Sequence, residues 1–318
     1  MPVLVLLDHD RGAAPGPTWQ AVTEARRIAD VLGTSVEALA IGTEELTHAA
    51  GTFGAETVHV ARHELLADYG PEAWGETITQ VAVGIGARAV LAPGTDRGQE
   101  AMAHAAARMD LPMVANAIAI EPGDPWRLVR IRWGGSLLEH SELSSSIPIV
   151  TVAPHAIEAE QHPVDPTVRI VGPELSPQLG RSIVVERETI SEGITLATAP
   201  VVVGGGRGVG SAEGFAVLED LAELLGGVVG CSRVVTNNGW RPHSDQVGQT
   251  GTKIAPNVYI ACGISGAIQH WVGAAASKNV VAINTDPEAN MVAKADYAVI
   301  GDLHEIVPAV AEEIRRRG

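Results

Sequence analysis

Short apolar runs alternate with amphipathic helical stretches along this chain, and that alternation limits its fold more than any single motif does. In the first half each run precedes a predicted helix, as VLVLL (3–7) precedes a helix at about 18–32. Such alternation is typical of βα units, in which parallel strands are buried beneath covering helices. The pattern recurs at VEALAIG (36–42), TVHV (57–60) and RAVLAPG (88–94). The sequence therefore predicts an α/β fold with mostly parallel sheets.

A second series of βα units begins near residue 199 and continues to the last helix. Between the two series, a segment at 127–153 whose residues predict strands is followed by a stretch with five prolines at 154–180. We interpret this proline-rich stretch as an extended arm or linker, because clustered prolines do not continue a helix. A chain of 318 residues also favours two domains over one. We expect a Rossmann-like N-terminal domain over 1–188 and a second domain over 189–318.

The charge of the chain differs between its halves and argues against one class of partner. The chain carries 22 Lys and Arg against 38 Asp and Glu, a net charge of −16. A phosphate backbone would be repelled by this charge, so no nucleic-acid partner is expected. Residues 199–318 hold only nine of the basic and twelve of the acidic residues. The near-neutral second half is therefore the better host for an anionic cofactor.

Several other kinds of site have no support in the sequence. The chain contains neither a run of about 20 apolar residues nor a signal-peptide core, so we expect a cytoplasmic protein without membrane insertion. Cys231 and Cys262 form no CxxC motif, and His59 and His63 lack a nearby set of carboxylates, so no metal site is predicted. No GxSxG motif is present, which leaves a hydrolase without support.

The glycine-rich run VVVGGGRGVGS (201–211) lies between a predicted strand and a predicted helix, where backbone N–H groups favour phosphate. No register of its glycines meets the GxGxxG fingerprint, and no GxxxxGK[ST] motif occurs. Two interpretations remain open: a phosphate-binding turn, or a tight turn that lets strand and helix pack. Arg207 favours the first, because a cation in such a turn needs an anion or solvent.

Six motifs follow one another through the second half of the chain. They are VVVGGGRGVGSAEGF (201–215), GCSR (230–233), QVGQTG (246–251), ISGAIQH (264–270), AINTDPEA (282–289) and ADYAVIGDL (295–303). In this order they closely resemble the FAD domain of electron transfer flavoprotein alpha subunits, and VLVLLDHD, RWGG and PIVTVAP carry a weaker resemblance through the first half. The chain departs from the family at Asn237 and Thr285, where many members have an aspartate and a lysine.

The resemblance implies a DHS-like, FAD-binding second domain, with three residues that tune the flavin. Thr250 would place its hydroxyl at flavin N5, and His270 would face the O2 edge with a protonated or donating imidazole. Arg233 would lie beside the ring. Negative charge develops on this part of the flavin on reduction, so hydrogen-bond donors and a permanent cation stabilise the reduced ring.

The resemblance also implies a wider set of FAD contacts. Arg207, Asn284 and Asp302 fall at positions that contact the pyrophosphate, ribityl or nucleotide end, although Asn284 could instead close a turn and Asp302 could cap the last helix. Ser265 is interpreted as a helix N-cap or a phosphate-side donor. The other implied contacts are Ser232, Gln246, Val247, Gly248, Gln249, Gly266, Ala267, Ile268, Gln269 and the backbone of Leu303.

The function that the resemblance implies is electron carriage without a substrate pocket. FAD would take electrons from a donor dehydrogenase and deliver them to a quinone-linked or other acceptor oxidoreductase. The first domain would pack on a beta subunit that carries AMP, or a second FAD in electron-bifurcating members. The main alternative is a nucleotide-dependent oxidoreductase on a related fold, which would turn over without a protein donor. A cofactor-free interaction partner is the third possibility, and it would bind no flavin.

Overall fold

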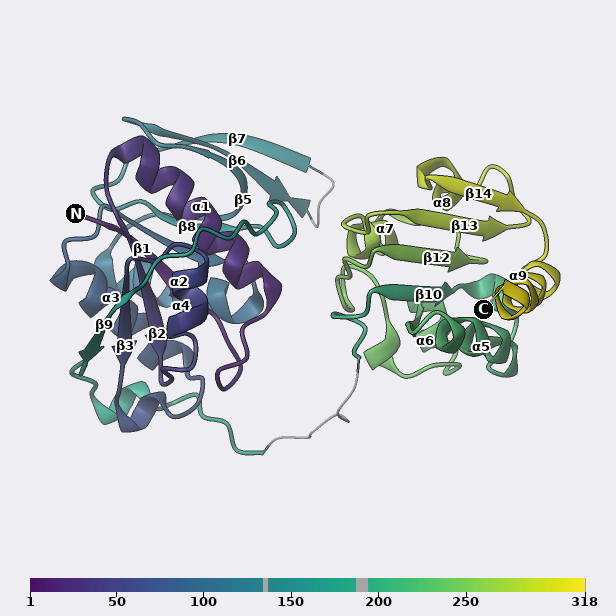
Figure 1. The fold of residues 1–318 in the computed structure, drawn as a ribbon, viewed down its shortest axis with the longest axis horizontal. Coiled ribbons are helices and arrows are strands. Elements are labelled where there is room, and N and C mark those ends of the chain that lie inside the picture. The colour runs from purple at the N-terminus through teal and green to yellow at the C-terminus, as the bar shows by residue number, and fades with distance from the viewer. Residues whose placement is uncertain (134–136, 187–193, 318) are drawn as a thin grey trace. The chain divides into compact units, whose positions relative to one another are not determined.

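The computed structural model describes residues 1–133, 137–186 and 194–317, and these form two compact units (Figure 1). The first unit consists of residues 1–133 and 137–186, and the second of residues 194–317. The expected boundary between residues 188 and 189 lies outside the described residues.

The described part of the first unit contains one nine-stranded sheet with helices against it (Figure 1). Its elements are β1 (Val3–Leu7), α1 (Gly16–Leu32), β2 (Val36–Ile41), α2 (Thr47–Thr52), β3 (Thr57–Ala61), α3 (Pro71–Gly84), β4 (Ala89–Pro93), α4 (Asp96–Met109), β5 (Met113–Glu121), β6 (Trp126–Arg132), β7 (Leu137–Leu143), β8 (Ile149–Val152) and β9 (Thr167–Val171). The strand order is β7-β6-β5-β8-β4-β1-β2-β3-β9.

Both faces of this sheet are covered, which explains why its central strand β1 is apolar without interruption. All five residues of β1 are buried. Val3, Val5 and Leu7 belong to one core cluster with α1, whereas Leu4 and Leu6 belong to a second cluster with α3 and α4. Because successive side chains of a strand point to opposite faces, a strand with a core on each side must be apolar at every position.

The segment at 127–153, whose residues predicted strands, contributes the antiparallel part of this sheet. β5 pairs in parallel with β8 but antiparallel with β6, and β6 pairs antiparallel with β7. The remaining pairs of the sheet, from β8 through β4, β1, β2 and β3 to β9, are parallel. The expected α/β class with mostly parallel sheets is therefore confirmed, with an antiparallel hairpin added at one edge.

The proline-rich stretch at 154–180 is extended but does not link two units. Its backbone N–H groups at His162 and Val164 donate to the carbonyls of Thr52 and Gly51 at the end of α2. β9 then pairs in parallel with β3 at the edge of the sheet. Of the two interpretations, arm and linker, these backbone hydrogen bonds agree with the arm, because they hold the stretch on the first unit.

The second unit contains a five-stranded sheet, in the described residues, whose pairs are all parallel. Its elements are β10 (Val201–Gly205), α5 (Ala216–Leu224), β11 (Val228–Cys231), α6 (Arg233–Asn237), β12 (Val258–Cys262), α7 (Ile268–Ala274), β13 (Val280–Asn284), α8 (Asn290–Lys294), β14 (Tyr297–Ile300) and α9 (Leu303–Arg317). β11, α6 and α8 were not expected from the sequence.

The strand order of the second sheet, β11-β10-β12-β13-β14, creates a topological switch point. From β10 the chain crosses to β11 on one side, and it then returns to β12 on the other side of β10. Loops that leave the carboxyl ends of β10 and β12 therefore diverge, and ligands of open parallel sheets bind in the crevice that this divergence opens. The fold alone points to the loops after Gly205 and Cys262.

Candidate functional site

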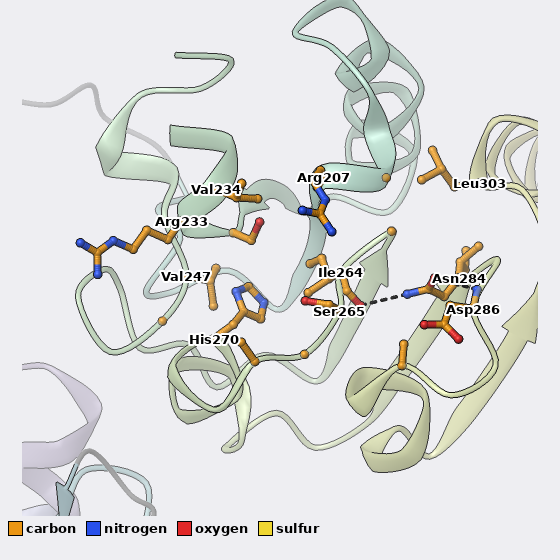
Figure 2. Close-up of a pocket in the computed structure, with 18 of the residues that line it drawn as sticks. Arg207, Arg233, Val234, Val247, Ile264, Ser265, His270, Asn284, Asp286 and Leu303 are labelled. Carbon is orange, nitrogen blue, oxygen red and sulfur yellow. Dashed lines mark hydrogen bonds between the residues drawn. The ribbon is translucent and has the colours of Figure 1, made fainter. Parts of the chain in front are cut away.

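A cleft of about 530 Å³ lies at this switch point (Figure 2). Its walls come from the loops that follow all five strands of the second sheet, together with the loop at 246–251 and the start of α7. A volume of this size is within the range of cofactor sites in proteins. The five carboxyl ends of the sheet thus converge on one site.

The structure brings the candidate residues together in this cleft, with one exception. Ile268, the first residue of α7, is 56% exposed and does not line the cleft. Thr285, where the chain departs from the family, is part of the lining. Sequence reasoning missed a group of mostly apolar and glycine positions that also line it: Gly208, Val234, Gly263, Ile264, Ile283, Asp286, Ala289 and Gly301.

The glycine-rich run after β10 is explained largely by packing. A Cβ atom at Gly204 would overlap the Tyr259 ring and hydroxyl, and one at Gly206 would overlap the backbone of Gly263. The backbones of Gly208 and Gly263 also approach each other too closely for a side chain on either. The run therefore serves close strand and loop packing, as one of the two open interpretations held, and this packing places Arg207 at the cleft.

The loop at 246–251 lies against α7 through contacts that only backbone can make. The N–H of Gln249 donates to the carbonyl of Gln269 at 2.7 Å. A Cβ atom at Gly273 would overlap the backbone N and Cα of Gly248. Sequence reasoning did not single out Gly273, although an isolated glycine in a predicted helix is a known signal of close packing. The position of this loop therefore depends on a helical glycine.

His270 lies in the first turn of α7 and is 6% exposed. Its Nε2 is 2.8 Å from the hydroxyl of Tyr259, which has no other hydrogen-bond partner in the described residues. The hydroxyl therefore donates to Nε2, and the ring hydrogen remains on Nδ1. Nδ1 is buried beside the Val247 backbone, although the two make no hydrogen bond of good geometry.

The environment of His270 keeps its imidazole neutral. Burial lowers the pKa of His270 to about 4, and the neighbouring Val247 backbone has a smaller, opposite effect. Of the two expected forms, the structure favours the neutral, donating imidazole over the protonated one. A protonated imidazole would require a cofactor charge strong enough to offset the loss of hydration.

The buried, neutral state of His270 predicts a pH dependence of stability. With a pKa near 6.5 in the unfolded chain, the unfolded state binds a proton first as pH falls, so the folded state loses stability between pH 6.5 and about 4. At pH 5 this loss is about 2 kcal/mol relative to pH 8. We expect the free energy of unfolding, measured by urea titration, to fall less for His270→Gln than for wild type as the pH is lowered over this range. Parallel pH curves for the two proteins would contradict this prediction.

Ser232 and two arginines occupy the wall opposite α7. Ser232 is 9% exposed, and its Oγ is buried without a hydrogen-bond partner in the described residues. Arg207 and Arg233 make no ion pair with any described residue, and both are exposed. Figure 2 shows the Arg207 side chain at the cleft, whereas the guanidinium of Arg233 extends away from it. Arg233 reaches a ring in the cleft only if its side chain rotates.

Of three further expected contacts, Ser265 lacks the capping role that the sequence offered, and two make structural hydrogen bonds. Ser265 is not an N-cap, because α7 begins at Ile268 and its cap residue is Ala267. Asn284 donates to the carbonyl of Ile264 at 3.0 Å and accepts from the N–H of Asp286, so it joins the loops after β12 and β13 (Figure 2). Asp302 accepts from the N–H of His304 and so caps α9.

The residues of the cleft fit an FAD molecule. Ser232 and His270 line the cleft, and their Oγ and Nδ1 atoms are buried polar groups without a hydrogen bond of good geometry in the described residues. Arg207 offers an unpaired cation for a pyrophosphate, and glycines bring bare backbone to the cleft wall. Asp286 and Asp302 are suited to ribose or ribityl hydroxyls rather than to phosphates, because a carboxylate accepts hydrogen bonds and repels an anion.

Two other kinds of structure are missing from the described ranges. No helix in them is long and apolar enough to cross a membrane. No group of three or more His, Cys, Asp and Glu side chains in them is arranged to hold a metal ion.

Comparison with known proteins gives matches over both units. Residues 3–176 match the family model of the electron transfer flavoprotein domain, and residues 195–275 match that of the electron transfer flavoprotein FAD-binding domain. The chain is 33% identical to the electron transfer flavoprotein subunit alpha of Thermoanaerobacterium thermosaccharolyticum, with 99% of this chain and 98% of that protein covered. The corresponding proteins of Bacillus subtilis and Mycobacterium leprae are 32% and 34% identical, each over 99% of this chain and over 97% and 98% of their own length. The chain therefore belongs to the electron transfer flavoprotein alpha-subunit family.

Proposed function

We propose that this chain binds FAD in the cleft of its second unit and, paired with a beta subunit, carries electrons from a donor dehydrogenase to an acceptor oxidoreductase. The observation that carries the proposal is the convergence of all but one of the candidate residues on a single cleft at the switch point. FAD supplies reversible one- and two-electron chemistry when bound. AMP or a second FAD is expected in the partner beta subunit, and the complex would act in the cytoplasm without membrane insertion.

The chain's own residues would bind the cofactor at one end and tune its electronics at the other. Arg207 is placed to hold the phosphates, while Asp302 and Asp286 accept from hydroxyl groups. Thr250 and His270 would supply hydrogen bonds to the part of the ring where negative charge develops on reduction. Because no step of this function transforms a substrate, the chain is proposed to be a carrier rather than an enzyme.

An anaerobic titration tests the proposed function. The purified heterodimer should take up a whole number of electrons per FAD from dithionite and return them to a redox dye. It should not oxidise NADH or NADPH by itself. Steady turnover of a nicotinamide cofactor without a protein donor would instead favour the nucleotide-dependent oxidoreductase.

Arg233 is predicted to raise the first reduction potential of the bound flavin. A charged hydrogen bond contributes roughly 1.5–3 kcal/mol, which corresponds to roughly 60–130 mV for one electron. Since Arg233 is exposed in this chain, solvent screening favours the lower end of that range. We therefore expect Arg233→Ala to lower the potential by about 60 mV in a spectroelectrochemical titration. An unchanged potential would remove Arg233 from this role.

A further inference from the structure

Three side chains form a hydrogen-bonded chain that ends at the cleft. The Thr236 hydroxyl lies 2.8 Å from Oε1 of Gln246 and 2.9 Å from the carbonyl of Arg233, so its one hydrogen is shared between these two acceptors. Nε2 of Gln246 donates to Oγ1 of Thr250 at 2.9 Å. Gln246 is only 2% exposed, whereas Thr250 is exposed and lines the cleft. A buried amide thus lies directly behind an accessible hydroxyl.

The orientation of the Gln246 amide decides the direction of the Thr250 hydroxyl. An amide has one accepting and one donating end, and in this structure the donating end, Nε2, faces Thr250. The accepting end, Oε1, faces Thr236. Because the Thr250 oxygen already accepts a hydrogen bond, its own hydrogen is left to donate elsewhere. The open side of that hydroxyl is the cleft.

The loop does not depend on these side-chain bonds for its position. The N–H of Thr252 donates to the Gln246 carbonyl at 2.7 Å, and the N–H of Gln249 donates to the Gln269 carbonyl at 2.7 Å. Gly273 and Gly248 pack backbone against backbone. Since these contacts hold the loop already, the Gln246 amide is available to orient a neighbour.

We propose that Gln246 is a positioning residue that acts on the cofactor through Thr250, by directing the Thr250 hydroxyl hydrogen into the cleft as a donor. This inference rests on the proposed function, because the acceptor is a ring atom of the flavin. It changes the role expected for Gln246 from a direct contact beside the ring to control of the hydroxyl that makes the contact. Thr236 contacts the other end of the amide and shares its hydroxyl hydrogen between Oε1 of Gln246 and the Arg233 carbonyl.

A double-mutant cycle on the first reduction potential tests this inference. The variants are Gln246→Met, which keeps the length of the side chain without its hydrogen bonds, Thr250→Val, and the double variant, each in the flavin-loaded heterodimer. Gln246→Met should lower the potential when Thr250 is present, because the donor is no longer directed at the ring. In the Thr250→Val background it should cause no further shift. Equal shifts in both backgrounds would overturn the inference.

A second variant and a matched control complete the test. Thr236→Val should lower the potential by less than Gln246→Met does, and this shift should also vanish in the Thr250→Val background. Gln99 is a half-buried glutamine of the first unit with two hydrogen bonds, so Gln99→Met should leave the potential unchanged. A wild-type heterodimer without flavin would overturn both the proposed function and this inference. Additive shifts in a flavin-loaded protein would overturn the inference alone.

Discussion

Gly273→Ala is expected to remove most of the affinity for FAD. The added methyl group would overlap the backbone of Gly248, so the loop at 246–251 must move away from α7 and carry Thr250 with it. Overpacking of this kind costs about 1–3 kcal/mol. If the bound state carries that cost, the dissociation constant rises about 5- to 150-fold. Quenching of FAD fluorescence on addition to the deflavinated heterodimer measures the change.

Gly84→Ala is the matched control for this substitution. Gly84 is also a helical glycine, at the end of α3, and a Cβ atom there would meet no atom within 4 Å. Alanine at that position should leave FAD affinity unchanged and stabilise the helix by as much as about 1 kcal/mol. If Gly273→Ala bound FAD as tightly as Gly84→Ala and wild type do, FAD binding would not depend on the close packing of α7 against the loop at 246–251.

Arg207→Ala is expected to weaken FAD binding by a similar factor. Arg207 follows β10 at the switch point, faces the cleft and has no ion-pair partner among the described residues (Figure 2). A charge-assisted hydrogen bond to a phosphate is worth about 1.5–3 kcal/mol, so the dissociation constant of FAD should rise about 10- to 150-fold. The loss should shrink as ionic strength rises, because salt screens the charge that wild type retains.

Arg207→Lys separates charge from geometry in this prediction. Lysine keeps the cation but lacks the planar fork that binds two phosphate oxygens, so its affinity should lie between those of wild type and Arg207→Ala. Arg315→Ala removes an exposed arginine of α9 that pairs with Asp220, and it should leave binding unchanged. Equal affinities for wild type and Arg207→Ala would exclude Arg207 from phosphate binding.

The sequence predicted those elements whose burial dictates their composition. β1 and β4 are covered on both faces, so they appear as uninterrupted apolar runs before helices. β9 has mostly exposed side chains and is held by backbone pairing, which leaves no hydrophobic pattern to detect. β11 has only four residues and follows two glycines, so it was not recognised as a strand.

The membership of the cleft could be predicted from the motifs, but only some of the bonds of its side chains could. The turn that Asn284 closes and the cap that Asp302 gives α9 were alternatives that the sequence left open. The bond from Asn284 to the carbonyl of Ile264 on another loop was not foreseen. The pairing of Tyr259 with His270 depends on a strand and a helix whose distance only the fold sets. The same holds for Gln246, whose partners Thr236 and Thr250 lie on separate segments.

The central claim is that the cleft of the second unit holds FAD, and the visible spectrum of the chain co-expressed with its beta subunit tests it most directly. Acid release should then identify the chromophore as FAD, with one per heterodimer if the beta subunit carries AMP and two if it carries a second FAD. A colourless heterodimer that binds no flavin even after flavin is added would contradict the claim.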